Sequence, residues 1–526
     1  MGVKEPDSLW FERLGQTYLE SGECDSALNA YQRARNLPGS HWRSIEGTAL
    51  AYAGKQMLSP AANEMERVLE TLRNKDGRTL EEQADFLQNI QRLADWRNDL
   101  RQPEIAIILY DEALKIDPDD YSIRRNMLKA LISAGQEERA RDMLNQMSSQ
   151  RAKKGNLSQL AEMLRHFVSL DERHKYFELV FSTMHRSDIF AIILEAMQRA
   201  IEFARGENMT VELATLLLHH GVALAHYGMG EKRIESALDL WEECCIVCSQ
   251  CAAVGMVMDS HELAVRYIGT YHFRQAMTAK QNGQSPNIHV ERLERLVNSI
   301  HDFRSVTTNA RSFLGSFYTL SGERQKAREL FLNDIRDAFS YLSDDYPEND
   351  YQGYYLFADV LMHYGDYLNA LSAWSLLGPR ERFPQEVGGP KAAAVNGETL
   401  ANRVDSVPKM GDLCNSCDGG CDKQWTFADN MWCCKFCHDV QFDDRCLKLL
   451  QEGKLERYIC SPDHDWLHVP AWSDKEYGEI GERRVKIGGE LVDGKRVGGR
   501  VVEVSEWLDI LRDEWGIPKP EKMADE

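Results

Sequence analysis

Hydrophobic residues recur along most of this chain at the three-to-four-residue spacing of amphipathic helices. Leu160, Met163 and Leu164, for example, fall on one face of a helix. This periodicity ends where Gly, Pro and Ala become frequent and no regular pattern continues. The pattern therefore predicts a helical region over residues 1–377 and a flexible linker over residues 378–409.

The helical region contains a repeated pair of helices. Glycine and alanine stand where two antiparallel helices would cross closely, tyrosine stands beside them, and Pro38 ends the second helix. The first copy is defined by Leu14, Gly15, Tyr18, Gly22, Ala27, Tyr31 and Ala34. Clear copies occupy residues 7–40, 87–120, 121–154, 308–341 and 351–377. Hairpins with disturbed spacing are expected at 42–70 and 216–241.

These positions resemble the tetratricopeptide repeat, a helix-turn-helix unit of 34 residues. The resemblance implies an all-α tetratricopeptide-like solenoid, whose groove holds an extended or helical segment of a protein or peptide partner. We read residues 155–307 as diverged repeats of the same solenoid; a separate helical domain is the alternative. Glu12 and Gln16 face the groove in the first copy, which therefore lacks the Lys and Asn clamp of some family members. Arg125, Asn126 and Lys129 make a later copy more cationic.

The charge balance narrows the classes of partner. The chain has 526 residues, with 62 Lys and Arg against 83 Asp and Glu, and a net charge of −21. This disfavours nucleic acid and anionic membranes, which attract cationic surfaces. The first residues carry no apolar signal region, and no apolar run is long enough to span a bilayer. We expect an intracellular protein of the cytoplasm, with the nucleus as the second compartment.

Cysteines occur in two groups with different expected roles. Cys244, Cys248 and Cys251 share one face of a helix without a second ligand pair nearby, which favours packing in the core. Eight of the thirteen cysteines fall between Cys414 and Cys460. Pairs of cysteine separated by two residues match the tetrahedral coordination of zinc, and a core this short needs a metal to fold. The second group therefore predicts a zinc-binding module over residues 410–472.

The order of these ligands resembles a ZZ-type zinc finger, in which alternate ligand pairs share two zinc ions. The resemblance implies a first site of Cys414, Cys417, Asp443 and Cys446, and a second site of Cys434, Cys437, Cys460 and His464. Asp443 stands where the family has a cysteine, and Cys460 where it has a histidine. Cys421 is the alternative to Asp443, and His468 is the alternative to Cys460.

Several ZZ fingers bind the N-terminal tail of a partner through acidic residues beside the zinc loops. The matching positions here are Asn415, Asp418, Asp439 and Gln441, of which two are acidic. The resemblance thus implies an N-terminal or basic tail as a second kind of partner. Trp425, Phe427 and Trp432 are expected in the core of the module.

Residues 473–526 are predicted to form short strands and a helix. Asp493 and Gly494 suit the turn of a hairpin, and Ser505 suits the start of a helix that carries Trp507 and Trp515. We expect this tail to pack on the zinc module or on the solenoid.

The repeats, the zinc module and this ending together resemble a group of fungal tetratricopeptide proteins. We find no catalytic motif: HExxH, GxSxG, the Rossmann glycine pattern and GxxxxGK[ST] are all missing from the sequence. The leading hypothesis is a non-catalytic adaptor or scaffold that binds structural zinc. The alternatives are a component of ubiquitin transfer, and a sensor arm for a separate NTPase, which some relatives carry in the same chain.

Overall fold

Short polar segments and glycine turns separate the helices of this chain, and the computed structural model shows where each begins and ends. It describes residues 7–39, 41–75, 77–152, 156–169, 173–185, 187–227, 232–251, 254–299, 304–344, 350–377, 417–421, 423, 429–438, 440–455, 460–481 and 483–519. The chain forms two units, Met1–Ser260 and His261–Glu526. The linker predicted over residues 378–409 lies outside the described residues.

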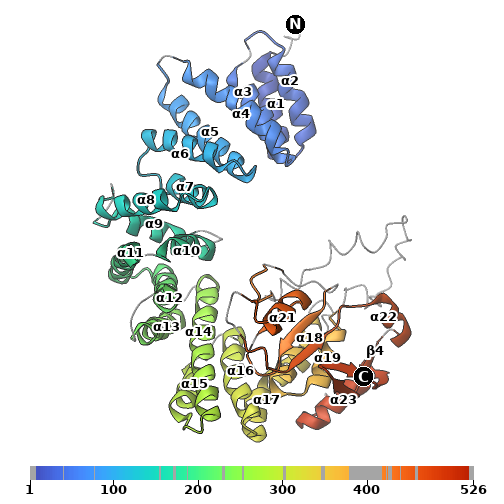
Figure 1. The fold of residues 1–526 in the computed structure, drawn as a ribbon. Helices are drawn as coiled ribbons and strands as arrows, with labels where there is room; N and C mark the ends of the chain where they lie inside the picture. Colours follow the sequence, from blue (N-terminus) through green and yellow to red (C-terminus); the bar gives the residue numbers. More distant parts are fainter. Residues whose placement is uncertain are drawn as a thin grey trace, which may run out of the picture. The chain divides into compact units, whose positions relative to one another are not determined.

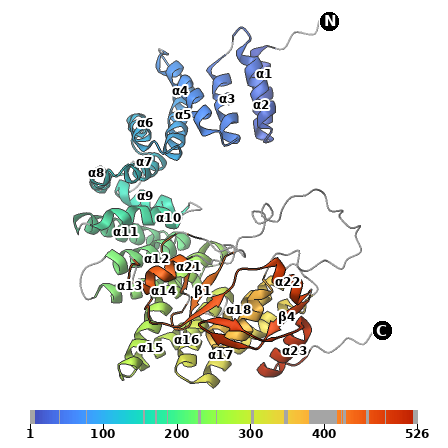
Figure 2. The same ribbon diagram turned by 45° about the vertical axis from the view of Figure 1, so that its right-hand side comes forward.

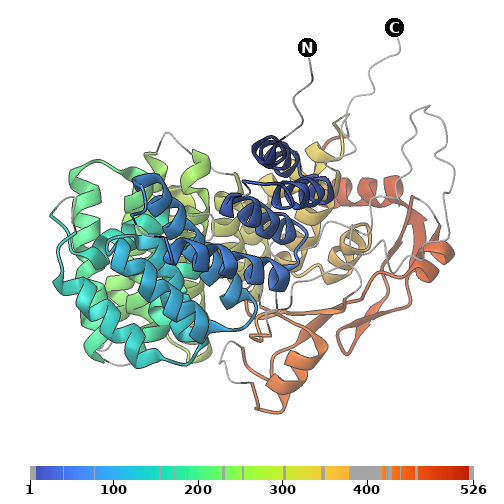
Figure 3. The same cartoon turned by 90° about the horizontal axis from the view of Figure 1, so that it is seen from above.

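The first unit is a succession of antiparallel helix pairs (Figures 1 and 3). Its helices are α1 (Ser8–Glu20), α2 (Cys24–Arg35), α3 (Trp42–Gly54), α4 (Leu58–Arg73), α5 (Leu80–Asp99), α6 (Pro103–Ile116), α7 (Tyr121–Ser133), α8 (Glu137–Ser149), α9 (Gln159–Val168), α10 (Arg173–Phe181), the short 3-10 helix η1 (Ser182–His185), α11 (Ser187–Gly206), α12 (Thr210–Tyr227) and α13 (Arg233–Ser249). The hairpins expected near residues 42–70 and 216–241 are therefore both present, as α3/α4 and α12/α13.

Close contacts between glycine and aromatic rings explain the repeated pairing. A Cβ added at Gly15 of α1 would lie 2.8 Å from Tyr31 Cζ, and one added at Gly47 of α3 would lie 2.2 Å from the same atom. Tyr31 of α2 therefore fills the space between α1 and α3, the first helices of two successive repeats. Both helices carry a glycine where they meet the ring. This is the role that the sequence predicted for the small residue at Gly15.

Helix α5 begins earlier than the sequence predicted for its repeat. The helix starts at Leu80 rather than near Leu87, because Thr79 and Glu82 form a capping box. Thr79 Oγ1 accepts a hydrogen bond from the Glu82 amide, and the Glu82 carboxylate accepts one from the Thr79 amide. These residues lie outside the repeat pattern, so the pattern alone did not locate them.

The second unit continues the helix pairs and adds strands. Its helices are α14 (Val254–Gln281), within which the boundary falls, α15 (Asn287–Ser299), α16 (Arg304–Leu320), α17 (Arg324–Tyr341), α18 (Asp350–Tyr364) and α19 (Tyr367–Ser375). Gly315 of α16 repeats the glycine contact of the first unit, with Phe331 of α17 as its aromatic partner. The region from 155 to 307 that we read as diverged repeats is mostly helical in its described residues, with helices α9 to α15 and the short helix η1.

A three-stranded antiparallel sheet follows the helices. Its strand order is β2-β1-β3, with β1 (Met431–Cys434) in the centre, β2 (Gln441–Phe442) on one side and β3 (Trp466–Val469) on the other. Cys434 pairs with Trp466, and Cys433 pairs with both Gln441 and Leu467. The short helix α21 (Asp444–Gln451) comes directly after β2.

The C-terminal tail caps the last repeat and also touches the sheet, so both expected contacts are present (Figure 2). Helix α22 (Asp474–Ile480) precedes two antiparallel pairs, β4 (Arg484–Ile487) with β7 (Arg500–Glu503) and β5 (Glu490–Val492) with β6 (Lys495–Val497). Asp493 and Gly494 form the predicted turn, both with positive φ. The Gly494 carbonyl accepts a hydrogen bond from the His468 amide of β3.

Helix α23 (Val504–Trp515) buries Trp507 against α18 and α19. Trp507 Nε1 donates a hydrogen bond to Asn369 Oδ1 at 3.0 Å. The predicted cap is wrong by two residues: Glu503 is the N-cap, and Ser505 lies inside the first turn, because strand β7 runs directly into the helix. In the described part of the chain, no helix combines the length and apolar character that crossing a membrane requires.

Candidate functional site

Three cysteines and one histidine converge beside the central strand of the C-terminal sheet. Cys434 ends β1, Cys437 lies in the turn after it, and Cys460 and His464 lie in the loop that leads into β3. His464 Nδ1 is 3.5 Å from Cys434 Sγ, 3.4 Å from Cys437 Sγ and 3.3 Å from Cys460 Sγ. Cys460 Sγ is 3.6 Å from each of the other two sulfurs.

These spacings fit one tetrahedral ion. Zinc–sulfur bonds of about 2.3 Å at tetrahedral angles place two sulfurs about 3.8 Å apart, and a shorter zinc–nitrogen bond brings nitrogen slightly closer. The four ligand atoms of this cluster all lie within 4.8 Å of one another. The donor set would close the coordination sphere with protein atoms, which is the arrangement of structural rather than catalytic sites.

Hydrogen bonds favour a thiolate at Cys434. Its sulfur accepts from the amides of Phe436 at 3.4 Å and Cys437 at 3.1 Å. Hydrogen bonds from the thiols of Cys437 and Cys460 hold the pKa of Cys434 far below its usual range, and the same contacts raise the pKa of Cys460. Without a cation the thiols share protons, and a metal would allow all of them to ionise.

A second cluster brings together Cys417, Cys421, Asp443 and Cys446. Cys421 Sγ is 3.6 Å from Asp443 Oδ2, while Asp443 Oδ1 accepts a hydrogen bond from the Cys446 amide at 2.6 Å and caps α21. A Cβ added at Gly419 would lie 2.4 Å from Cys446 Sγ. The backbone at residue 419 therefore lies so close to Cys446 that only glycine fits there.

Of the first site implied by the sequence, the structure places Cys417, Asp443 and Cys446 together. Cys414 lies outside the described residues, and Cys421, the alternative, stands beside the other three. All four residues of the second implied site, Cys434, Cys437, Cys460 and His464, lie together. His468 is directed elsewhere, with its ring 4.5 Å from that of Trp432.

The residues considered for binding a partner's tail have structural contacts. Asp418 Oδ2 accepts a hydrogen bond from the Gln441 amide at 2.8 Å, and the Asp418 amide donates to the Gln441 carbonyl. These bonds tie the loop of Cys417 to β2. Trp432 Nε1 donates to Asp444 Oδ1 at 2.8 Å. Asn415, Asp439, Trp425 and Phe427 lie outside the described residues.

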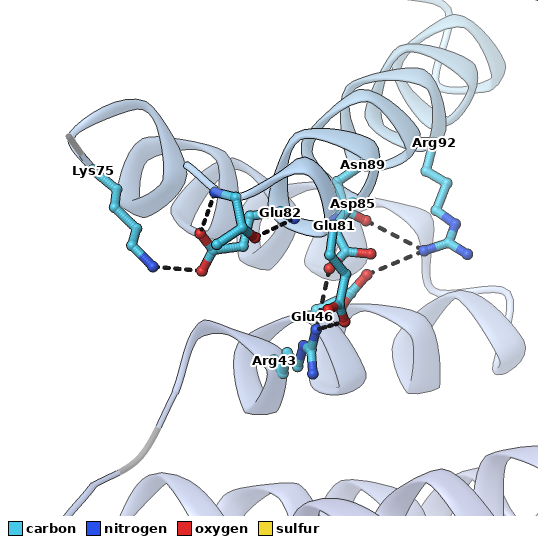
Figure 4. Close-up of polar contacts among 9 residues, drawn as sticks. Arg43, Glu46, Lys75, Glu81, Glu82, Asp85, Asn89 and Arg92 are labelled. Carbon is cyan, nitrogen blue, oxygen red and sulfur yellow. Dashed lines mark hydrogen bonds and ion pairs between the residues drawn. The ribbon is translucent and has the colours of Figure 1, made fainter. Parts of the chain in front are cut away.

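The first helices of successive repeats form a second candidate surface. Arg43 of α3 pairs with Glu81 at 2.7 Å and with Asp85 of α5 at 3.3 Å, and Arg92 of α5 pairs back with Glu46 of α3 at 3.2 Å (Figure 4). Burial raises the pKa of Glu46. The network therefore combines a partly buried ion pair, Arg92 with Glu46, and the more exposed ion pairs of Arg43.

Arg125 and Asn126 of α7, noted from the sequence, extend this polar surface. Asn126 Nδ2 donates a hydrogen bond to Asp95 Oδ1 at 2.8 Å, and the Arg125 guanidinium lies 4.7 Å from the ring centroid of Tyr176. Tyr110 donates to the same carboxylate oxygen of Asp95 at 2.5 Å. Arg125 and Asn126 are therefore fixed by neighbours.

Of the cysteines expected to pack in the core of the solenoid, Cys244 and Cys248 are buried, whereas Cys251 is only partly buried. Cys244, Cys245 and Cys248 of α13 are buried, and the Cys244 thiol donates to the Ala214 carbonyl at 3.3 Å. Burial raises the pKa of Cys245, which favours the uncharged thiol.

Comparisons with known proteins agree with the helical repeats. Residues 100–164 match the tetratricopeptide repeat family, so the chain contains such repeats, and its fold is a tetratricopeptide-like solenoid followed by small strands and cysteine clusters. No curated protein matches the chain.

Solved structures match at low identity. The chain is similar to YrrB, a tetratricopeptide repeat protein with an unusual peptide-binding site, at 14% identity over 48% of this chain and 91% of that one, with a TM-score of 0.25. It is similar to part of a repeat protein from Cytophaga hutchinsonii at 10% identity, 61% and 98% coverage and a TM-score of 0.30. A signal transduction ATPase with a tetratricopeptide repeat sensor from Pyrococcus horikoshii matches at 15% identity, 70% and 51% coverage and a TM-score of 0.30.

Proposed function

We propose that this chain is a non-catalytic adaptor that binds a basic, extended segment of a partner protein along the first helices of its N-terminal repeats. The observation that carries the proposal is the ladder of polar side chains between α3 and α5 (Figure 4). Tetratricopeptide repeats are typically protein-binding scaffolds, and a stack of them offers an extended surface to a peptide.

Contacts between first helices support their place on the inner side of the stack. Helix α1 contacts α3, α5 contacts α7, and α7 contacts α9, although each pair is separated in sequence by a second helix. First helices crowd together in this way when they line the concave side of a superhelix. A bound peptide would then meet residues of α1, α3, α5 and α7.

The charges of this surface favour a basic ligand. On α3 and α5, the carboxylates of Glu46, Glu81 and Asp85 pair with only two arginines, Arg43 and Arg92. The Arg43 side chain is 48% exposed and that of Glu81 is 75% exposed, so their pair contributes little to stability. A lysine or arginine of a partner could take the place of Arg43 against Asp85 at low cost.

A charge reversal tests this binding surface. We expect Asp85→Arg to lose the partners that the full-length wild-type protein captures from a lysate of its source organism, as read by quantitative mass spectrometry. Glu70→Arg on the second helix α4 is the matched control and should retain them. Partners that bind equally well to Asp85→Arg would refute this surface as the binding site.

We further propose that the two cysteine clusters hold structural zinc, one ion each, in a ZZ-like arrangement. Thiolate-rich sets with one imidazole suit zinc, which accepts tetrahedral sulfur and nitrogen ligands. Purified protein should contain two zinc ions per chain by elemental analysis, and Cys460→Ser should contain one. Cys251→Ser, outside both clusters, should keep both, and zinc-free wild-type protein would contradict the proposal.

A role in ubiquitin transfer or as an arm of an NTPase finds no specific support in the site. An autoubiquitination assay with a panel of conjugating enzymes should be blank for the full-length protein. A basic tail at the zinc module is likewise outside the proposal, because Asp418 already accepts the Gln441 amide.

A further inference from the structure

The turn after β1, residues 435–438, lies against the helices of the last two repeats. The imidazole of His438 stacks on Phe313 of α16, with ring centroids 3.8 Å apart, and on His363 of α18, with centroids 4.3 Å apart. His438 Nε2 lies 2.7 Å from Ser312 Oγ. This side chain therefore enters between two first helices that also contact each other.

The ligands of the proposed metal centre shape this turn. Cys434 precedes the turn and Cys437 lies within it, and the Cys434 sulfur accepts hydrogen bonds from the amides of Phe436 and Cys437. Phe436 packs against both the core of the helical repeats and the core of the sheet. The sulfur-centred turn thus fixes where Phe436 and His438 meet the helices.

The seam between this turn and the helices is incompletely filled. A cavity of about 50 Å³ lies there, lined by residues of α16, α18, α19, β1 and the turn. Ser316 of α16 lines it and is only 5% exposed. Polar groups at this seam, such as the Ser316 hydroxyl, regain hydrogen bonds with water when the seam separates, which lowers the cost of separating it.

We propose that the metal at Cys434, Cys437, Cys460 and His464 holds the C-terminal module on the groove side of α16 and α18, so that the chain covers its own last two repeats. The inference rests on the proposed zinc centre and adds a consequence to it. The metal-loaded protein keeps these repeats closed to peptides, and loss of this metal releases the turn and uncovers Phe313 and His363. The groove of the first unit is unaffected.

Hydrogen–deuterium exchange of the full-length protein, with and without a zinc chelator, tests this coupling. We expect amides of residues 312–320 and 357–364 to exchange roughly tenfold faster after chelation, while those of α3 to α6 stay unchanged. Amides of α17 and α23 serve as an internal reference for the core of the second unit. Equal acceleration in α17 and α23 would show general unfolding and overturn the inference.

Two variants separate docking from metal binding. His438→Ala and His363→Ala should keep both zinc ions and still show the faster exchange of residues 312–320 without chelator. His468→Ala, whose ring contacts Trp432, is the matched control and should match the wild type. Protein that binds no zinc overturns both the metal centre and this inference. Protein that binds zinc, yet shows unchanged exchange in α16 and α18 after chelation, overturns this inference alone.

Discussion

Phe331 lies so close to the backbone of Gly315 that a Cβ added at the glycine would be 2.3 Å from Cζ of the ring. Helices α16 and α17 cross at this point, and Phe331 is 1% exposed. Tyr31 has the same relationship to Gly15 and Gly47 in the first unit. Each of these glycines is thus required by an aromatic ring on a neighbouring helix.

Gly315→Ala should therefore destabilise the second unit. Overpacking in a core costs about 1–3 kcal/mol, and the better helix propensity of alanine returns at most about 1 kcal/mol. We expect a net loss in the free energy of unfolding, measured in urea by circular dichroism. Gly478→Ala is the control, because a Cβ there meets nothing within 4 Å, and it should be neutral or stabilising.

The repeats could be predicted because their packing rule is local. Gly15, Ala27 and Tyr31 stand at fixed spacings within one helical hairpin, so the sequence alone predicts where its two helices cross. The start of α5 could not be found in this way, because Thr79 and Glu82 form a cap outside the repeat. Even so, a Thr followed by Glu at the third residue is a recognisable capping signal.

The cysteine clusters could be predicted only in part. Two residues separate Cys434 from Cys437, and three separate Cys460 from His464, so each pair is visible in the sequence. Which pairs meet depends on how β1 and β3 align, which spacing does not determine. The contact of His438 with Phe313 had no signal in the sequence, because it joins segments on different parts of the fold.

The capping helix α23 should carry a large share of the stability of the second unit. Trp507 is fully buried and bonds Asn369. Trp507→Ala should lower the free energy of unfolding by about 3–5 kcal/mol, the usual cost of removing a buried aromatic side chain. Trp10→Ala, at a position 50% exposed, should change it by less than about 1 kcal/mol. Similar small effects for both variants, measured by calorimetry, would contradict the capping role.

Measuring the zinc content of variants can identify the fourth ligand of the cluster around Cys446. The position of Cys421 Sγ near Asp443 leads us to expect that Cys421→Ser binds one zinc ion fewer per chain than the wild type. The physical reason is the loss of a thiolate, since a serine hydroxyl is a poor zinc ligand at neutral pH. Cys24→Ser, in helix α2, should leave the zinc content unchanged. A full zinc content in Cys421→Ser, with one ion lost in Cys414→Ser, would assign the role to Cys414.

Buried histidines should make the first unit sensitive to acid. Burial lowers the pKa of His220 on α12 from 6.5 to about 4, and the side chain is only 7% exposed. The unfolded chain then takes up a proton near pH 6.5, whereas the folded chain does so only near pH 4. The unfolded state binds more protons in this window, so stability falls as the pH decreases from 6.5 to 4 and is unaffected above it.

The share of His220 in this loss can be isolated. One such histidine contributes a slope of up to about 1.4 kcal/mol per pH unit within the window. Burial lowers the pKa of His219 and His226 in the same unit, so other histidines also contribute to the wild-type slope. His220→Leu removes the contribution of this histidine and fills the same space with an apolar side chain. The free energy of unfolding of the variant, measured in urea, should therefore depend less on pH between 6.5 and 4 than that of the wild type. Equal slopes in the two proteins would mean that His220 takes up its proton without a cost to folding.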